Sequence, residues 1–438
     1  MLFITIFILL LLAWFGAPLF TLILSVSILG FTYQEIDLTV IPIELYRLTN
    51  TPLLLALPLF TFTGYIMGES NTSKRLVRLS SALLGYLPSE LVLVTLFASA
   101  FFTAFTGATG VTIVALGALL YPALKESGYS EKFSLGLITT SGSLGLLLPP
   151  SLPLILYVVI VQQLDLEQSI RIEDVFLAGI FPTLLMIFTL FFWSIWQTSR
   201  SNKNQQNTPI MPKQVSKAYS TKELLSALRE SIWELPLPFI VLGGIFSGVF
   251  AVSEAAAVTA LYIIIVEVFI YQEVRLQQLP KIIEESMTMI GGILLILACA
   301  LAMTNYFIDA EIPVLLFNWI QNHVTSQVTF LLLLNIFLLL LGALLDIFSA
   351  IVIMSPLIVP IAISFGVHPV HLGIIFLANM QLGYLTPPVG MNLFIASYRF
   401  NKSIFDVYRS TIVMMLLLLG CVLLITYVPA ISLFFIEQ

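Results

Sequence analysis

Four interruptions of long apolar segments contain most of the side chains in this sequence that could bind an ion or a small anion. Two are the double prolines Pro149-Pro150 and Pro387-Pro388, and the other two are residues 106–110 and 346–349. A helix interrupted inside a membrane leaves carbonyl oxygens that suit Na⁺ and N–H groups that suit an anion. Glycine permits close approach of the backbone, and proline removes a donor. We therefore expect these breaks to bind ions and substrate.

Hydroxyl, amide and acidic side chains flank each break and could supply further oxygen ligands. In the first half of the chain they are Thr106, Thr109, Thr140, Ser141, Ser143 and Ser151, and in the second half they are Asp346, Ser349, Asn379, Gln381, Thr386 and Asn392. For an anionic substrate we expect contacts from Thr109, Gly110, Ser141, Ser143, Ser151, Asn379, Gln381 and Asn392. Each break could instead be a packing kink, but four breaks in matched pairs favour a binding site.

Asp346 is the only acid at an apolar break of this kind. An acidic residue inside a membrane segment commonly marks a functional site. The alternative is that its carboxylate only caps the N-terminus of a helix. His368 and His371 have no third candidate ligand nearby in the sequence, so we expect no transition-metal site there.

The helices that hold these breaks must lie in a membrane, because the composition fits no soluble globular protein. Of 438 residues, 59% are hydrophobic and 10% are charged, and the mean hydropathy is +1.04. Apolar runs near or above about 18 residues recur along the chain. We predict an all-α, multi-pass membrane protein with about ten to twelve transmembrane helices. Cys299 and Cys421 both lie in apolar runs, so no disulfide framework is expected.

Landmarks recur at one constant spacing along the chain, which indicates an internal duplication. Pro122 pairs with Pro360, Gly145 with Gly383, and the first double proline with the second. We predict a first repeat over residues 1–196, a linker with an amphipathic helix over 197–234, and a second repeat over 235–438.

Corresponding elements are expected in the two repeats. The first repeat should contain scaffold residues 1–30, an interfacial arm at 31–49, a hairpin at 89–124 and a broken helix at 131–162. The second should contain an arm at 271–285, a hairpin at 327–362 and a broken helix at 371–398. The arms of each hairpin are short for full crossings, so we expect both hairpins to be re-entrant.

Loop charges indicate that the two repeats have opposite orientations. The loop at 69–78 carries Lys74, Arg75 and Arg78, whereas its counterpart at 307–316 carries only acidic charges. By the positive-inside rule, equivalent loops of opposite charge lie on opposite sides of the membrane, and the basic linker is cytoplasmic. We therefore predict an inverted-topology repeat, with the N-terminus outside.

Enzyme signatures are missing from the sequence. There is no phosphate-binding loop of the kind that nucleotide hydrolases use, no HExxH zinc motif, and no Ser/His pairing within apolar segments. Transport is the function class that remains, and an intramembrane enzyme or assembly factor is the rival from another class.

Several motifs together resemble the large membrane subunit of tripartite ATP-independent periplasmic (TRAP) transporters. They read FTGATGVTIVALGALLYPALKESGY, LLLPPSLPLILY, FSGVFAVSEAAAV and NMQLGYLTPPVGMNLFIAS. The resemblance covers essentially the whole chain and implies an elevator-type fold of the ion-transporter superfamily, in the bacterial inner membrane. It also implies uptake of a small carboxylate coupled to Na⁺, with no other cofactor.

The same resemblance implies two partners and two ion sites. The partners would be a small four-helix membrane subunit and a periplasmic substrate-binding protein. One Na⁺ site would use Thr106, Gly107 and the backbone of Gly145, Leu148 and Pro150, and the other would use Asp346, Ser349, Ala350 and the backbone of Gly383, Thr386 and Pro388. A stand-alone transporter of the same superfamily, working without a binding protein, is the alternative.

Overall fold

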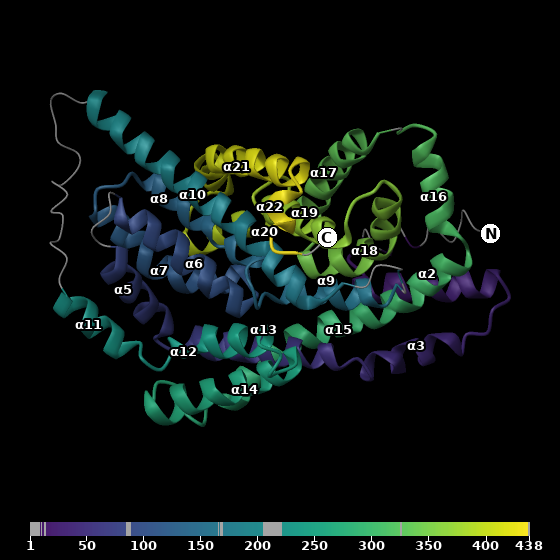
Figure 1. Cartoon of the computed structure of the whole chain (residues 1–438), viewed down its shortest axis with the longest axis horizontal. Helices are drawn as coiled ribbons and strands as arrows, with labels where there is room; N and C mark the ends of the chain where they lie inside the picture. Colours follow the sequence, from purple (N-terminus) through teal and green to yellow (C-terminus); the bar gives the residue numbers. More distant parts are fainter. Residues whose placement is uncertain are drawn as a thin grey trace.

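A computed structural model describes residues 15–84, 89–164, 170–204, 221–324 and 326–436, together with residues 9, 11, 12 and 166. These residues form helices and connections, with no strand among them. Eight helices in the described part are long and apolar enough to span a membrane, and five shorter apolar helices accompany them. The chain is therefore an all-α, multi-pass membrane protein (Figure 1).

The first half of the chain runs through nine α-helices in the described residues. They are α2 (Leu19–Tyr33), α3 (Val40–Thr49), α4 (Ala56–Glu69), α5 (Thr72–Leu84), α6 (Glu90–Thr106), α7 (Thr109–Glu126), α8 (Glu131–Ser141), α9 (Leu152–Gln162) and α10 (Ile172–Asn204). Short 3₁₀ segments, η1 (Pro52–Leu55) and η2 (Leu144–Leu147), lie before α4 and between α8 and α9.

The second half begins after the linker with α11 (Thr221–Glu230). It continues through α12 (Pro236–Pro238), the π-helical η3 (Phe239–Gly243), α13 (Gly244–Phe246), α14 (Val252–Ile264), the π-helical η4 (Ile265–Ile270) and α15 (Leu279–Asp309). The remaining helices are α16 (Ile312–Gln321), α17 (Gln327–Leu344), α18 (Ile347–Ser364), α19 (Pro369–Gly383), α20 (Met391–Phe400), α21 (Ile404–Tyr427) and α22 (Ala430–Leu433).

Helix boundaries in the two halves recur at the spacing that the sequence showed. Helix α18 begins and ends at the positions that this spacing assigns to α7, and α20 begins one residue later than the position that it assigns to α9. Gly128 and Gly366 both have positive φ, and both Pro-Pro bonds are cis. Opposite orientation of the two halves in a membrane, and movement of one part against another, stay predictions.

Two predicted segments fall partly outside the described residues. The start of the predicted scaffold segment, at 1–8, and the middle of the predicted linker, at 205–220, are among the residues that the structure does not describe. The predicted external N-terminus lies in residues 1–8 and is therefore outside the described part. Within the described part of the linker, α11 occupies the place expected for an amphipathic helix.

Two predicted boundaries were wrong. The second arm, expected at 271–285, is not a separate helix, because α15 runs without interruption from Leu279 to Asp309. In the first half Pro52 begins η1 and separates α3 from α4, whereas the equivalent position in the second half is Ile290, which continues a helix. Helix α10 also extends to Asn204, beyond the predicted end of the first repeat at residue 196.

Each half packs a broken helix against the hairpin of the other half. Helix α9 packs along α18, and α20 packs along α7; α9 and α18 lie side by side in Figure 1. The phenol Oη of Tyr157 on α9 donates to the carbonyl oxygen of Pro369 at 2.7 Å, and both residues are buried. The two halves therefore share one interior.

Close backbone contacts hold each break against the hairpin of its own half. A Cβ placed on Gly383 would lie 2.5 Å from the carbonyl carbon of Gly342 on α17. A Cβ on Gly145 would lie 2.0 Å from the carbonyl oxygen of Ala100 and 2.6 Å from the nitrogen of Ala104 on α6. Glycine is therefore required at both positions because neighbouring backbone atoms leave no room for a Cβ, and not because φ is positive.

The contact between Gly383 on α19 and Gly342 on α17 predicts the outcome of one matched pair of substitutions. Gly383→Ala forces α19 away from α17 and should destabilise the protein by about 1–3 kcal/mol, as overpacking usually does. Gly420→Ala is the control, because a Cβ there meets nothing within 4 Å. Thermal unfolding in detergent measures both variants, and equal melting temperatures would show that the α17–α19 contact is not tight.

Candidate functional site

The tip of the first hairpin lies between the end of α6 and the start of α7. Gly107 ends α6 with φ of +62°, and a Cβ there would lie 2.4 Å from Cδ1 of Leu152, the first residue of α9. The N-cap of α7 is Ala108, which has no side chain able to accept from the free N–H groups of the first turn. The hydroxyl of Thr106 accepts only a long bond of 3.4 Å from the Ala108 nitrogen. The tip thus presents a helix start that no side chain caps.

The first break spans residues 142–151 and lies against this tip. The carbonyl of Gly145 accepts from the Leu148 nitrogen at 3.1 Å, and the carbonyl of Leu148 accepts from the Ser151 nitrogen at 3.0 Å. The hydroxyl of Ser151 donates to the carbonyl of Leu146 at 2.7 Å. A carbonyl oxygen has two lone pairs, so Gly145 and Leu148 each keep one for a further ligand. Pro149 and Pro150 are buried.

Hydroxyl groups on the first hairpin form hydrogen bonds with the first break and with the end of α8. The Thr103 hydroxyl lies 2.9 Å from the carbonyl oxygen of Gly142 and 2.8 Å from the Thr112 hydroxyl. Ser141 donates to the Ser99 hydroxyl at 3.2 Å. We had not predicted roles for Thr103, Thr112 or Ser99, and the available signal was their hydroxyls inside otherwise apolar helices.

The tip of the second hairpin is built differently. Asp346 is the N-cap of α18, and its carboxylate accepts from both the nitrogen and the hydroxyl of Ser349. The phenol oxygen of Tyr384, which is buried, accepts from the Ile347 nitrogen at 2.7 Å. Ala350 donates its nitrogen to the Asp346 carbonyl at 3.0 Å within the first turn. The capping role that the sequence left open for Asp346 is therefore confirmed, and Tyr384 is a participant that was not predicted.

The second break follows Gly383 and is more exposed than the first. The Gly383 carbonyl accepts from the Thr386 nitrogen at 2.9 Å, and the Thr386 hydroxyl donates to the carbonyl of Leu382 at 3.0 Å. The break also meets its hairpin, because the Gly390 nitrogen donates to the carbonyl of Ala343 at 3.3 Å. Pro387 and Pro388 are exposed, in contrast to the buried prolines of the first break.

The start of α9 lies against the first hairpin tip, and the middle of α20 lies against the start of α7. Gly107 contacts Leu152 at the start of α9, and a Cβ on Gly110 would lie 2.9 Å from Cδ1 of Ile395 on α20. Helices α7, α9 and α20 all begin without a side-chain cap. The positive ends of their dipoles, together with the backbone N–H groups that Ala108 leaves uncapped at the start of α7, would favour a negative charge.

The predicted substrate residues divide into two groups. Asn392 at the start of α20 donates to the carbonyl of Thr139 at 3.4 Å, and its Oδ1 atom is buried with no partner in the described part of the chain. Asn379 instead donates to Asn335 on α17 at 2.7 Å, and Gln381 lies against Met186 on α10. Asn392 therefore lies at the start of α20 against α8, whereas Asn379 and Gln381 donate within the helix bundle, and each of these two also has a buried amide oxygen without a partner in the described residues.

The remaining predicted positions lie near the first tip. Thr109 and Gly110 form the start of α7 itself. Ser143 bonds weakly back to the Thr140 carbonyl at 3.4 Å, and the Thr140 hydroxyl has no partner among the described residues.

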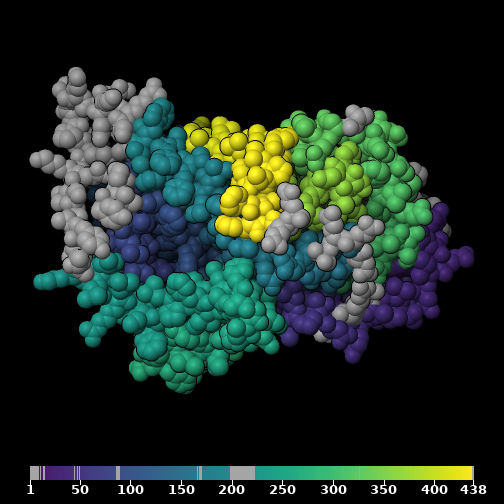
Figure 2. All heavy atoms as spheres, viewed as in Figure 1, coloured from purple at the N-terminus to yellow at the C-terminus, as the bar shows by residue number. Residues whose placement is uncertain are grey.

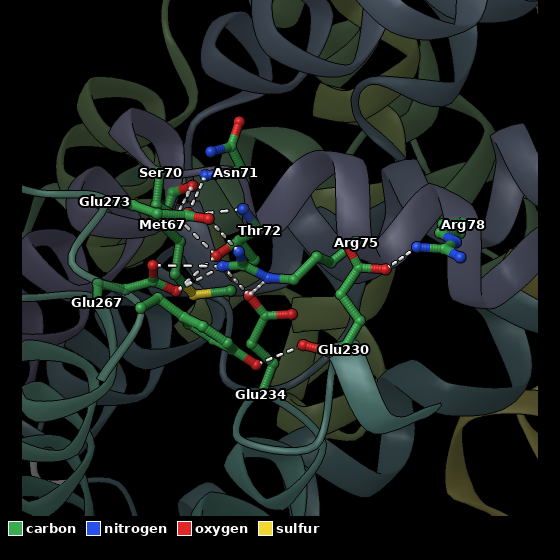
Figure 3. Close-up of polar contacts among 11 residues, drawn as sticks. Met67, Ser70, Asn71, Thr72, Arg75, Arg78, Glu230, Glu234, Glu267 and Glu273 are labelled. Atoms are coloured by element: carbon green, nitrogen blue, oxygen red, sulfur yellow. Dashed lines mark hydrogen bonds and ion pairs between the residues drawn. The ribbon is translucent and has the colours of Figure 1, made fainter. Parts of the chain in front are cut away.

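A buried ion cluster lies apart from the breaks, around Arg75 on α5 (Figure 3). The guanidinium contacts Glu234 at 2.6 Å, Glu267 at 3.1 Å and Glu273 at 2.5 Å. It also lies 4.0 Å from the ring centroid of Tyr271. Arg75 is 5% exposed, although the sequence suggested only a cytoplasmic loop charge. The cluster joins α5 to the start of the second half.

Neighbouring groups also bond to the carboxylates of this cluster, and the surroundings shift the pKa values of Glu234 and Glu273. The Asn71 nitrogen donates to Glu273 at 2.7 Å, and the Thr72 hydroxyl donates to Glu267 at 2.9 Å. Burial raises the pKa of Glu234, and the guanidinium of Arg75 only partly offsets that rise. For Glu273 burial acts in the same direction, but the bonds from Asn71 and Arg75 outweigh it and hold its pKa below the usual value.

The arrangement defines a class of protein: a multi-pass membrane protein with two hairpin tips set against two broken helices. A crystal structure of the Alcanivorax borkumensis YdaH transporter has a similar fold, with a TM-score of 0.61 and 17% identity over 86% of this chain and 85% of that one.

Sequence comparison places the chain in a family. Residues 3–431 match the family described as the tripartite ATP-independent periplasmic transporter, DctM component, and the chain belongs to that family. It is 32% identical to a C4-dicarboxylate TRAP transporter large permease protein of Pseudomonas aeruginosa, over 89% of this chain and 88% of that protein. It is 30% identical to a sialic acid TRAP transporter large permease protein of Vibrio cholerae, over 78% and 77%.

Two substitutions at Asp346 distinguish the stability that comes from capping α18 from the stability that comes from the negative charge. Asp346→Ala should cost about 1 kcal/mol, because the first turn of α18 loses its side-chain acceptor. Asp346→Asn should keep most of that stability, because asparagine is an equally good N-cap. Thermal unfolding tests the pair, and equal losses in both variants would show that the charge rather than the cap stabilises α18.

Removal of Arg75 should be far more damaging than removal of a neighbouring exposed lysine. Arg75→Met leaves the buried carboxylates of Glu234 and Glu267 without their cation and should cost about 3–5 kcal/mol at neutral pH, whereas Lys74→Met should change little. Without the guanidinium, the folded-state pKa of Glu234, already raised by burial, rises further and that of Glu273 rises too, so stability is lost as pH rises and recovers toward low pH. Melting temperatures from pH 5 to pH 8 measure this, and a pH-independent loss would contradict it.

Proposed function

We propose that the chain is the permease subunit of a TRAP system that imports a small carboxylate, driven by a Na⁺ gradient. The observation that carries the proposal is that α7 and α9 begin next to each other at the first hairpin tip without side-chain caps, with α20 packed along α7. This arrangement offers fixed donors to an anion without an arginine.

The anion belongs with these helix starts rather than at the start of α18. The carboxylate of Asp346 already accepts from the nitrogen of Ser349 at 3.0 Å, so a second negative charge there would be repelled. At the first tip, Ala108 offers no competing acceptor. Asn392 and Thr140 add polar groups close to the same place.

Two Na⁺ ions would bind beside the anion, one at each hairpin tip. At the first, the carbonyls of Gly145 and Leu148 each retain a lone pair next to Thr106 and Gly107, and Pro150 completes the predicted set. At the second, Asp346 supplies a charge and the carbonyls of Gly383 and Thr386, with Pro388, complete it. Hard oxygen ligands of this kind suit a monovalent cation.

Transport would proceed by movement of the hairpin-bearing part against the remaining helices. A periplasmic binding protein would deliver the carboxylate from outside the inner membrane, and a small four-helix subunit would accompany this chain in the bilayer. The difference in exposure between the two double prolines supports access from one side at a time. Each tip would be ordered by its Na⁺ before movement.

Reconstitution of the full system tests the proposal. The purified chain, the small subunit and the ligand-loaded binding protein are combined in proteoliposomes, and the ligand is identified first by screening carboxylates, beginning with C4-dicarboxylates, on the binding protein. Uptake should require an inward Na⁺ gradient and the binding protein, and should stop when an ionophore dissipates the gradient. Equal uptake in choline medium, or without the binding protein, would overturn the proposal.

Variants at the two breaks test the ion sites in the same assay. Asp346→Asn preserves the cap but removes the charge, so we expect at least tenfold weaker Na⁺ dependence, in line with the loss of one charge-assisted contact. Pro150→Ala should weaken Na⁺ dependence through the first site while membrane insertion stays normal. Wild-type Na⁺ affinity in both variants would contradict the proposal that Na⁺ binds at the two hairpin tips.

A further inference from the structure

A cavity of about 380 Å³ lies between α5, α6 and the residues that lead into α12, away from the helix breaks. Its walls are mostly apolar side chains, including Leu79 and Leu83 from α5 and Phe97 and Phe101 from α6. Figure 2 shows this part of the first half recessed behind the teal surface of residues 221–270. The cavity is large enough for a chain of methylene groups rather than for water alone.

Two buried polar atoms that line the cavity, one on Ser231 and one on Glu234, lack hydrogen-bond partners in the described part of the protein. Ser231 is 1% exposed and its Oγ has no hydrogen bond, and Glu234 is 4% exposed and its Oε2 has none. Figure 3 shows one oxygen of Glu234 directed at Arg75 and the other turned away from it. An unpaired carboxylate oxygen inside a protein is strongly unfavourable, so a donor at this position would be bound tightly.

The charge of the neighbourhood specifies which donor fits. One guanidinium, that of Arg75, faces the three carboxylates Glu234, Glu267 and Glu273. A cationic donor would therefore balance a negative excess, whereas an anion would be repelled. The apolar walls require that this cation carry a hydrocarbon portion.

We propose that the cavity binds a membrane amphiphile that bears a protonated primary amine. The ammonium donates to Oε2 of Glu234 and to Oγ of Ser231, and the hydrocarbon chain lies between α5 and α6. The occupant contacts α6 of the first hairpin as well as α5 and the α12 region, so its binding ties the hairpin to its surroundings. The site is independent of the transport proposal, because it uses none of the residues at the breaks.

Four single-chain probes of equal length test the chemistry directly. Binding of decylammonium, decyltrimethylammonium, decanol and decanoate to the full chain in phosphatidylcholine nanodiscs is measured by calorimetry, with empty nanodiscs subtracted. Decylammonium should bind saturably with one site per chain. Decyltrimethylammonium, which has no N–H donor, should bind at least about tenfold more weakly, and decanol and decanoate should show partitioning only.

Variants test the location without disturbing the ion cluster. Ser231→Ala removes a hydroxyl that has no partner among the described residues, so the melting temperature should not fall, but decylammonium affinity should drop about tenfold. Ala98→Leu fills the cavity from α6 and should abolish saturable binding. Ser226→Ala, at an exposed position on α11, is the control and should bind as the wild type does.

Several results would overturn the site. These are absence of saturable decylammonium binding to the wild type, equal binding of decanol or decanoate, and wild-type affinity in both Ser231→Ala and Ala98→Leu. The last result would leave an ordered water as the partner of the two unpaired atoms. Repeating the titration in nanodiscs that contain phosphatidylethanolamine shows whether the natural occupant is a lipid or a free amine. If the lipid binds in the cavity, it should compete with decylammonium and lower its apparent affinity.

Discussion

The structure depends on one constraint: backbone groups inside a membrane need partners, and this chain interrupts its helices where partners are scarce. Each break is covered by a hairpin at backbone contact distance, through Gly145 against α6 and Gly383 against α17. The Thr103 hydroxyl reaches the Gly142 carbonyl from outside the break. The uncapped starts of α7 and α9 and the carbonyls of Gly145 and Leu148 are where ion and anion binding would have its basis.

The two halves share helix boundaries but not the chemistry of their hairpin tips. Ala108 and Asp346 occupy corresponding positions in the two repeats, and each is the N-cap of the second helix of its hairpin. Alanine leaves the start of α7 uncapped, whereas aspartate fills the start of α18 with a carboxylate. The start of α7 would therefore favour an anion, whereas the carboxylate at the start of α18 would repel one.

Much of this framework could be predicted from the sequence, because glycine, proline and the constant spacing act locally. The two broken helices are interrupted where Pro149-Pro150 and Pro387-Pro388 indicated, and the helices of each hairpin meet at the breaks expected at 106–110 and 346–349. The continuous α15 departs from the repeat because Ile290 stands where Pro52 interrupts the first half. The partners of Arg75 could not be predicted, since Glu234 and Glu267 lie far from it in the sequence and only folding brings them together. The same holds for Tyr384, whose phenol reaches the second tip from the end of α19.

The central claim is that Na⁺ binds at the breaks and orders the hairpin tips, and hydrogen–deuterium exchange of the reconstituted chain measures this most directly. Exchange is compared in Na⁺ and in choline at equal ionic strength, with mass spectrometry resolving individual segments. The account predicts slower exchange in Na⁺ at residues 104–110 and 142–151 and at 344–350 and 383–391, with α14 and α15 unchanged. Identical exchange in the two media, or protection confined to helices outside these four segments, would contradict it.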